Sequence, residues 1–281
     1  MLFPFEKYHG AGNDFIIVRR EVLLPEMGTI EAVVRAVCDR HYGVGADGFF
    51  LVKKVVDGRC RLAFYNSDGS KAAMCGNGAR CVSAYLFAHL GRDRLWLEIG
   101  AKRVESVLLP SGEISIRMPV EAWVEWLPAE GGYLLDTGVP HLVMGCESIA
   151  ALHSLDLEAV ARPLRYSVVG DGNGVNVDFY AYKAGHLVMR TYERGVEGET
   201  LACGTGAVAV ALIAAAVYNI PSPVAVYPPG GRLRVRFERV VNAEGELSYR
   251  EVFLEGWAVR IARGEFFLPK KIKKKGTRRE V

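Results

Sequence analysis

Short runs of β-branched and aromatic residues, broken by glycine, aspartate or proline, recur along most of this chain. Runs of this kind predict β-strands. In the first part of the chain we expect strands at Phe15–Val18, Phe49–Val52, Arg61–Tyr65, Arg94–Ile99, Arg103–Leu109 and Glu113–Met118. Later strands are expected at Leu134–Asp136, His141–Met144, Asn176–Tyr182, His186–Thr191, Val224–Tyr227, Leu233–Glu238 and Tyr249–Glu255. Many short strands with few helices predict an α+β fold rich in sheet.

Four helices are expected among these strands. Apolar residues at helical spacing after a capping threonine predict a helix over Thr29–Asp39, and a shorter one is expected at Asp156–Ala161. The other two, Ala79–Leu90 and Ala207–Tyr218, differ in kind, because the last of them is apolar on every side. A helix of this composition is buried all round. The pattern therefore predicts a sheet curled around a central helix, twice.

The two halves of the chain also resemble each other. The segment CGNGA at Cys75–Ala79 recurs as CGTGA at Cys203–Ala207, 128 residues later. GNDFIIV at Gly12–Val18 resembles GVPHLVM at Gly138–Met144, 126 residues later. A repeated offset of this kind indicates duplication. We therefore expect two pseudo-symmetric domains, each a mainly antiparallel β-sheet curled around a central apolar α-helix.

We expect the N-terminal domain over 1–118 and the C-terminal domain over 119–261, with a strand at 262–269 that returns to the first domain. The last twelve residues carry seven Lys or Arg and one Glu, so the remaining body has a formal charge of −3 although the whole chain has +3. A basic tail over 270–281 without interleaved aromatic residues is expected to be disordered and does not predict nucleic-acid binding.

The N-terminal residues show no signal-peptide pattern, and no apolar run approaches the roughly 20 residues that span a bilayer. We therefore expect a cytoplasmic protein without a membrane contact. Its cysteines are expected to be reduced there.

A cysteine at the start of each buried helix has a chemical consequence. The first N–H groups of a helix lack intrahelical partners and carry partial positive charge, which attracts a carboxylate and stabilises a thiolate. Lowering a thiol pKa from about 8.5 to about 7 requires about 2 kcal/mol. A helix terminus can supply about this much in a partly buried geometry, so we expect a lowered thiol pKa at both cysteines. Inverting a carbon atom beside a carboxylate requires a base on one face and an acid on the other. One such cysteine in each domain therefore predicts a two-base racemase or epimerase that uses Cys75 and Cys203.

The remaining cysteines are expected to be small buried hydrophobic residues; they are Cys38, Cys60, Cys81 and Cys146. Cys75 and Cys81 are six residues apart without a second pair, which does not predict a zinc site. The glycine-rich segments fit neither a dinucleotide fingerprint nor a Walker loop. We expect neither a metal nor a cofactor.

Longer segments resemble the diaminopimelate epimerase family of lysine biosynthesis, in the family's order. They are HGAGNDFIIV at His9–Val18, RHYGVGADG at Arg40–Gly48, YNSDGSKAAMCGNGARC at Tyr65–Cys81 and YERGVEGETLACGTGA at Tyr192–Ala207. The resemblance implies conversion of L,L-2,6-diaminopimelate to meso-diaminopimelate in a cleft between the domains, without pyridoxal phosphate or metal. It also implies a homodimer.

The resemblance assigns roles to particular residues. Cys75 and Cys203 become the acid/base pair. The reacting carboxylate is cradled by Gly76, Asn77, Gly204 and Thr205. The polar ends of the substrate are held by Asn13, Asn66, Asn176, Glu193 and Arg194. Arg194 suits the distal carboxylate, because its planar guanidinium binds bidentately. His141 and Glu193 are implied to lie near the cysteines, where they orient substrate or tune the thiols.

Two positions depart from the family's common pattern. Val139 and Gly48 stand where many members have an amide that could bind substrate. A two-cysteine racemase of a different amino acid therefore remains an alternative. A non-catalytic carboxylate-binding protein is an alternative of another class, although it does not account for paired thiols. Asn66, within NSDG, is equally typical of a turn.

Overall fold

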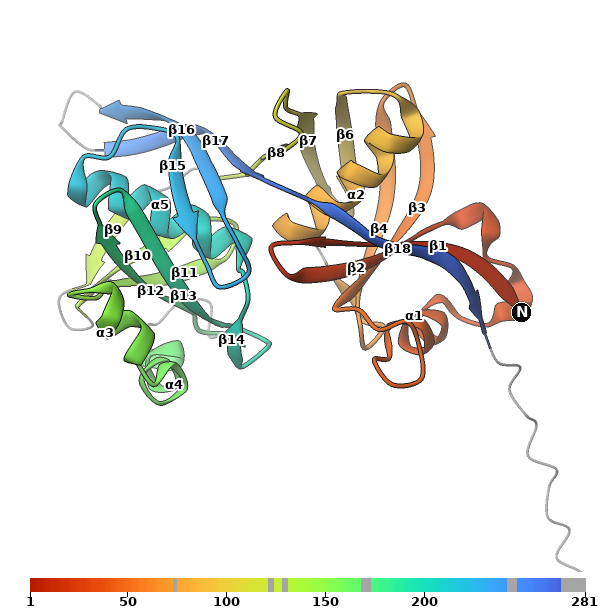
Figure 1. The fold of residues 1–281 in the computed structure, drawn as a ribbon, viewed down its shortest axis with the longest axis horizontal. Coiled ribbons are helices and arrows are strands. Elements are labelled where there is room, and N and C mark those ends of the chain that lie inside the picture. Colours follow the sequence, from red (N-terminus) through yellow and green to blue (C-terminus); the bar gives the residue numbers. More distant parts are fainter. Residues whose placement is uncertain (73–74, 121–123, 128–130, 168–172, 242–246, 269–281) are drawn as a thin grey trace, which may run out of the picture.

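The computed structural model describes residues 1–72, 75–120, 124–127, 131–167, 173–241 and 247–268. The basic tail at 270–281, expected to be disordered, lies outside the described residues, and so does residue 269. Two lobes lie side by side, and strands that run from one lobe to the other join them (Figure 1). No helix among the described residues is long and apolar enough to cross a membrane.

The N-terminal lobe is a curled sheet that encloses one helix. Its strands are β1 Leu2–Gly10, β2 Asn13–Arg19, β3 Gly48–Val56, β4 Arg59–Asn66, β5 Lys71–Ala72, β6 Arg94–Ile99, β7 Lys102–Leu108, β8 Ile114–Arg117 and, from the end of the chain, β18 Val259–Phe267. Helix α2 (Gly76–Leu90) packs inside the curl, and α1 (Ile30–Cys38) packs against the other face of the sheet. Two short 3-10 turns, Arg20–Val22 and Pro25–Met27, precede α1.

The C-terminal lobe repeats this arrangement. Its strands are β9 Val124–Leu127, β10 Gly132–Asp136, β11 Pro140–Gly145, β12 Asn176–Lys183, β13 His186–Glu193, β14 Gly198–Thr200, β15 Val224–Tyr227, β16 Leu233–Val241 and β17 Leu247–Gly256. Helix α5 (Gly204–Tyr218) is the enclosed helix, whereas α3 (Ile149–Ser154) and α4 (Leu157–Ser167) pack outside.

Strand pairing shows that the two lobes are duplicates. In the first lobe β2–β3 and β4–β6 are parallel pairs, and in the second the equivalent pairs β11–β12 and β13–β15 are parallel. The register also agrees, because Phe15 pairs with Gly48 as His141 pairs with Asn176. The predicted α+β fold of two pseudo-symmetric domains is confirmed.

The two enclosed helices each begin three residues before the predicted start. Cys75 and Cys203 are their N-caps, with extended backbone, and the glycine-rich turns that follow are already helical. Helix α1 has the predicted cap, since the Thr29 hydroxyl accepts a hydrogen bond from the N–H of Ala32. Helix α4 extends past its predicted end through an internal proline. Helix α3 is only six residues long, too short for a periodic signal, and was not expected.

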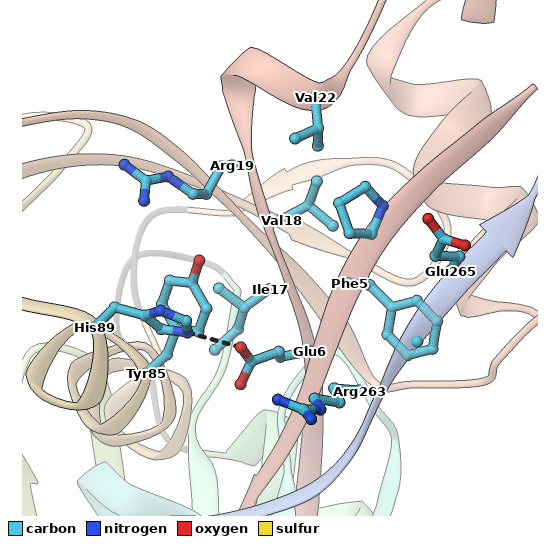
Figure 2. Close-up of a pocket in the computed structure, with 12 residues that line it drawn as sticks. Phe5, Glu6, Ile17, Val18, Arg19, Val22, Tyr85, His89, Arg263 and Glu265 are labelled. Carbon is cyan, nitrogen blue, oxygen red and sulfur yellow. Dashed lines mark hydrogen bonds and ion pairs between the residues drawn. The ribbon is translucent and has the colours of Figure 1, made fainter.

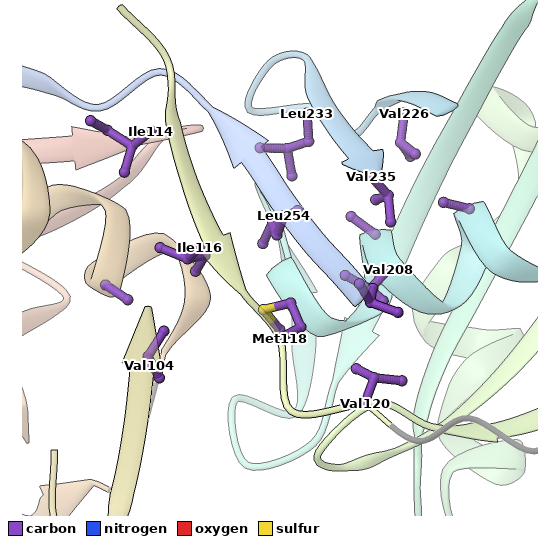
Figure 3. Close-up of a cluster of buried hydrophobic side chains, with 14 of the residues drawn as sticks. Val104, Ile114, Ile116, Met118, Val120, Val208, Val226, Leu233, Val235 and Leu254 are labelled. Atoms are coloured by element: carbon purple, nitrogen blue, oxygen red, sulfur yellow. The ribbon is translucent and has the colours of Figure 1, made fainter. Parts of the chain in front are cut away.

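The lobes are joined by a pair of equivalent strands. β8 and β17 pair antiparallel, with Ile116 opposite Leu254, and their buried side chains form part of one continuous hydrophobic cluster (Figure 3). The chain runs on from β8 into β9 of the other lobe, and from β17 into β18, which pairs with β1. Each lobe therefore receives one edge strand from the other lobe's junction strand: β9 follows β8, and β18 follows β17.

Leu254 is the side chain whose truncation should test this junction. It is fully buried, and its Cδ2 atom lies against the first residue of both enclosed helices, Gly76 and Gly204. Leu254→Ala should lower the free energy of unfolding by about 2–5 kcal/mol, measured by urea denaturation, because it leaves a cavity at the junction. Leu24→Ala, at a half-exposed leucine, should cost less than about 0.5 kcal/mol. Equal losses in the two variants would contradict this assignment.

Candidate active site

The two cysteines occupy identical positions at the heads of the enclosed helices. The Cys75 sulfur accepts the backbone N–H of Gly78 at 3.4 Å, and the Cys203 sulfur accepts that of Gly206 at 3.4 Å. Each thiol therefore takes the place of a capping side chain and satisfies one of the unpaired N–H groups of the first turn. Cys203 is buried, whereas Cys75 is partly buried.

The first turns of the two helices meet. A Cβ atom built on Gly204 would lie 3.5 Å from the Gly76 Cα atom, so the backbones of the two helix heads are within about one methyl group of each other. The Asn77 side chain crosses the junction and donates from Nδ2 to the carbonyl of Ala202 at 2.8 Å. Two positive helix ends are thereby held together in one place.

Asn13 lies beside Cys75 and is held by an acidic cluster. Its Nδ2 donates to Asp47 at 2.7 Å, and its Oδ1 faces the Cys75 sulfur at 3.6 Å. Arg40 bridges Asp47 and Asp14, with nitrogen–oxygen distances of 2.6 and 2.9 Å. Because Asp47 takes the amide N–H₂ group, the carbonyl oxygen of Asn13 is the atom that faces the thiol.

A buried polar group lies beneath the first turn of α5. His141 Nδ1 is 2.6 Å from Asp178 Oδ2, and the Thr191 hydroxyl donates to Asp178 Oδ1 at 2.6 Å. All three residues are almost completely buried. Hydrogen bonding on both oxygens is the condition under which a buried carboxylate is tolerated.

The buried polar group of His141, Asp178 and Thr191 also contacts Asn176, which in turn binds the backbone of Arg194. Asn176 Nδ2 is 3.4 Å from His141 Nε2, and Asn176 Oδ1 accepts the backbone N–H of Arg194 at 2.8 Å. The Arg194 side chain donates from Nη1 to the carbonyl of Gly174 at 3.0 Å. A chain of contacts thus runs from beneath α5 to Arg194.

Thr205 contacts the Cys203 thiol, and Glu193 acts on both thiols through its charge. The Thr205 hydroxyl is 3.3 Å from the Cys203 sulfur. Glu193 ends β13, and its negative charge raises the pKa of both Cys75 and Cys203. Burial in turn raises the pKa of Glu193 itself.

The expected fall in the thiol pKa is wrong for this structure. Burial raises the pKa of Cys75 to about 11, although the N–H of Gly78 acts in the opposite direction. Burial also raises the pKa of Cys203, and the charges of Glu193 and Asp178 raise it further. The sequence revealed the helix terminus but not how little water reaches the sulfur atoms, and here desolvation is the larger effect.

Asn66 is not brought to the thiols by any hydrogen bond between described residues. Its Nδ2 donates to the Ser70 hydroxyl at 3.0 Å within its own turn, and the side chain is exposed. Gly48, opposite Asn66 in the sheet, has a steric explanation. A Cβ atom there would lie 2.8 Å from the Phe64 ring, so the position has no room for an amide.

Two residues near the thiols were not among the predicted ones. Arg80 and Asp178 are completely buried, and both act electrostatically on a cysteine. A signal for each was present in the sequence. Arg80 is the one Lys, Arg, Asp or Glu in a helix that is mostly apolar, and Asp178 interrupts the apolar run of a predicted strand.

A groove elsewhere on the N-terminal lobe lies between β1, β2, β18 and the outer end of α2 (Figure 2). It encloses about 420 Å³, and a 2.7 Å contact between His89 and Glu6 crosses its floor. None of the predicted site residues lines it. This groove is therefore separate from the two helix heads that carry Cys75 and Cys203.

Sequence comparison places both lobes in one family. The diaminopimelate epimerase family matches residues 5–122 and 133–249. The diaminopimelate epimerase of Archaeoglobus fulgidus is 36% identical over 284 residues, which cover 94% of this chain and 96% of that protein. The one of Aquifex aeolicus is 32% identical and covers 92% and 96%. The chain belongs to the diaminopimelate epimerase family.

Solved structures outside the diaminopimelate epimerase family share the fold. A PhzF-family phenazine biosynthesis protein of Bacillus anthracis has a TM-score of 0.70 at 16% identity, covering 94% of this chain and 99% of that chain. A hydroxyproline epimerase of Agrobacterium vitis, with bound trans-4-hydroxy-L-proline, has a TM-score of 0.64 at 14% identity, covering 94% and 92%. At these identities the likeness establishes the two-lobed fold alone.

The acidic cluster around Asn13 has a consequence for stability in this family member. Burial acts to raise the pKa of Asp14, but hydrogen bonds from Arg40 and Lys7 outweigh it and lower the pKa to about 2. A carboxyl whose folded pKa lies below its unfolded value of about 3.9 stabilises the protein above that value, and this is lost as the pH falls through about 2. The contribution amounts to about 2 kcal/mol.

Asp14→Asn should therefore lower the free energy of unfolding by about 2 kcal/mol at pH 7, measured with urea. It should also reduce the loss of stability between about pH 4 and 2, because the titrating group is gone. Asp93→Asn, at an exposed aspartate, serves as the matched control. An unchanged acid profile in Asp14→Asn would show that Asp14 does not carry this dependence.

Proposed function

We propose that this chain is an isomerase that converts L,L-2,6-diaminopimelate to meso-diaminopimelate in lysine biosynthesis. The observation that supports it most is the pair of cysteine N-caps, Cys75 and Cys203, on two helices whose first turns touch. This geometry offers two thiols and two sets of helix N–H groups to one small carboxylate. Membership of the diaminopimelate epimerase family supports the choice of substrate.

The reaction needs one thiolate and one thiol, on opposite faces of the substrate's α-carbon. A thiolate takes the α-hydrogen from one face of the substrate, and the electron pair of that C–H bond moves toward the carboxylate. The thiol on the other face then gives its proton to the α-carbon. The negative charge ends on the second sulfur, so charge and protons balance without a cofactor or a metal.

The helix heads would hold the reacting carboxylate. Backbone N–H groups at Gly76, Asn77, Gly204 and Thr205 would point at its oxygens, where negative charge grows as the α-hydrogen leaves. Their positions are fixed by packing and by the Asn77 bridge, so little reorganisation is needed during reaction.

The substrate's other polar groups would meet the neighbouring side chains. We assign its amine and distal end to Asn13, Asn66, Asn176, Glu193 and Arg194, with His141 orienting Asn176. Arg194 would bind the distal carboxylate. The hydrogen bond from the Arg194 backbone to Asn176 supports this assignment, because Asn176 also contacts His141 in the buried polar group beneath Cys203.

Incubation with L,L-diaminopimelate in D₂O, followed by chiral separation, tests the proposal. Deuterium should appear at one α-carbon of the product. Cys75→Ala and Cys203→Ala should each reduce inversion at least about 100-fold, because each removes one of the two proton carriers. Cys146→Ala, in the outer layer of the C-terminal lobe, is the matched control and should react at the wild-type rate. Full activity in either catalytic variant would reject the two-thiol mechanism.

Arg194→Met should reduce kcat/KM for diaminopimelate about 10- to 100-fold, since charged hydrogen bonds contribute about 1.5–3 kcal/mol. Arg162→Met removes an arginine that is exposed in an i,i+4 pair, and it should leave the constant unchanged. An equal effect of both variants would remove Arg194 from the site.

The same assays separate the alternatives. Turnover of another amino acid without turnover of diaminopimelate would favour a racemase of different specificity. Carboxylate binding without any α-hydrogen exchange would favour a non-catalytic binding protein.

We also propose that the protein is a cytoplasmic homodimer. Each subunit has an N-terminal domain over 1–118 and a C-terminal domain over 119–261, and the return strand expected at 262–269 corresponds to β18, which begins at Val259. Strand β18 pairs on one side with β1, and several large apolar side chains on it are exposed, among them Ile261 and Phe267. Such an edge can pair with a second copy. Sedimentation velocity distinguishes a dimer from a monomer.

A further inference from the structure

The two thiols at the duplicated helix heads lie near buried side chains of opposite charge. We propose that Arg80 and Asp178 polarise the thiol pair, so that Cys75 is the sulfur that ionises first and Cys203 is the one that keeps its proton. This inference rests on the proposed function, because it assigns the starting base and the starting acid of that reaction. Arg80 and Asp178 are positioning residues, since they act through the cysteines.

Asp178 occupies the place that a phenylalanine takes in the other lobe. A Cβ atom on Gly206 would lie 2.5 Å from Asp178 Oδ1, and one on Gly78 would lie 2.6 Å from the Phe50 ring. Phe50 precedes Asp178 by 128 residues, the same offset that separates the two cysteines. The duplication has therefore left an acid beneath Cys203 and a hydrocarbon ring beneath Cys75.

The neighbours of these two residues differ in the same way. Phe50 stacks on Phe64, with ring centroids 4.7 Å apart, and meets the edge of Phe15 at 5.7 Å. The equivalent neighbours of Asp178 are Thr191 and His141, and both are hydrogen-bonded to it. An apolar cluster in one lobe is thus a polar one in the other.

The histidine beside Asp178 does not neutralise it. Asn176 Oδ1 accepts the Arg194 N–H, so the amide N–H₂ group of Asn176 is the one that faces His141 Nε2. Asn176 Nδ2 donates one hydrogen to the Pro140 carbonyl at 3.3 Å, and its second hydrogen faces His141 Nε2 at 3.4 Å. An acceptor at Nε2 fits this contact, and it corresponds to the tautomer with the single imidazole proton on Nδ1, toward Asp178. Thr191 donates to the other oxygen. A neutral imidazole leaves Asp178 with its negative charge.

Arg80 supplies the opposite charge in the N-terminal lobe. Its side chain is completely buried and doubles back along α2, donating to Asn77 Oδ1 at 2.8 Å, while its Nε has no hydrogen-bond partner among the described residues. The side chains whose ionised form would favour the Arg80 cation are Cys81 and Cys75, as thiolates. The equivalent residue in α5 is the buried Val208.

A buried cation without a carboxylate is costly unless another anion balances it. The thiols of Cys81 and Cys75 both act on Arg80, Cys81 more strongly, but a Cys75 thiolate would also be stabilised by the N–H of Gly78. Cys81 is farther inside the lobe, and burial raises its pKa strongly. Cys75 is therefore the better of the two anions.

Other charges do not reverse this order. Glu193 raises the pKa of both thiols and so does not separate them. Of the two catalytic thiols, Cys75 is the one whose ionisation the charge of Arg80 favours, and Cys203 is the one whose ionisation the charge of Asp178 disfavours. His141 is neutral by the hydrogen bonds described above.

Two contacts favour the opposite order and must be weighed. The carbonyl oxygen of Asn13 faces Cys75 at 3.6 Å and accepts from a thiol, and the Thr205 hydroxyl can donate to Cys203 at 3.3 Å. Hydrogen bonds between such groups contribute about 1 kcal/mol. For Cys203 the charge of Asp178 raises the pKa by more than the Thr205 hydrogen bond lowers it, and for Cys75 the charge of Arg80 adds a smaller effect in favour of ionisation. The charges therefore decide the order.

Alkylation by iodoacetamide, followed at each cysteine by peptide mass spectrometry across about pH 8 to 12, tests the inference because the thiolate is the reactive form. The midpoint of the Cys75 profile should lie at least about one unit below that of Cys203. Asp178→Asn should lower the Cys203 midpoint by about one unit and leave that of Cys75 in place. A lower midpoint for Cys203 in the unaltered protein would overturn the proposal.

The arginine variants form a matched pair. Arg80→Met should raise the Cys75 midpoint by about one unit, whereas Arg80→Lys keeps the charge and should preserve the order. Asp93→Asn, at the surface, should change neither midpoint. Equal shifts of both cysteines in Asp178→Asn, or a Cys75 midpoint that falls in Cys81→Ala, would contradict the assignment. If Arg80→Met does not fold, the unaltered protein and Asp178→Asn still decide the matter.

The alkylation assay contains no substrate, so it is independent of the proposed function. If the protein inverts diaminopimelate but Cys203 ionises before Cys75, the inference about Arg80 and Asp178 is rejected and the proposed function is not. The expected order without inversion of diaminopimelate would reject the proposed function alone.

Discussion

The close contact between the first turns of α2 and α5 is the constraint on which the rest of the structure depends. Helix N-termini carry partial positive charge and repel one another, so they meet only where packing forces them together. Gly76 and Gly204 permit the approach, and the buried Leu254 packs against both. The pairing of β8 with β17 holds that leucine in place. The sheets, the chain crossings and the core all serve to bring two unsatisfied helix ends to one point.

Duplication explains how such a contact can arise. Two copies of one curled sheet, related by a pseudo-twofold axis, bring equivalent elements together at that axis, and β8 and β17 are such a pair. Anything at the head of one enclosed helix then faces its counterpart on the other. Under the proposed mechanism, a thiol that serves only as a cap in a single lobe becomes one of two proton carriers when the lobe is doubled.

The two copies have since diverged beneath the thiols, where symmetry is not useful. A two-base enzyme needs its sulfur atoms in different protonation states, and identical surroundings would not favour either arrangement. A phenylalanine cluster below α2 and a hydrogen-bonded aspartate below α5 occupy equivalent space with opposite polarity. The buried Arg80 adds to the difference, since Val208 stands at its equivalent position in α5.

The sequence alone determined the strands, the two enclosed helices, the duplication and the two cysteines, because each is written in local periodicity or in a repeated motif. It also supported the family, through long motifs in a fixed order. Tertiary structure decided the rest. Hydration of the sulfur atoms, and with it the direction of the thiol pKa shifts, depends on how closely the lobes pack. The partners of Arg80 and Asp178 come from segments far apart in the chain or from a folded-back side chain, and no local pattern encodes which charge lies beneath which thiol.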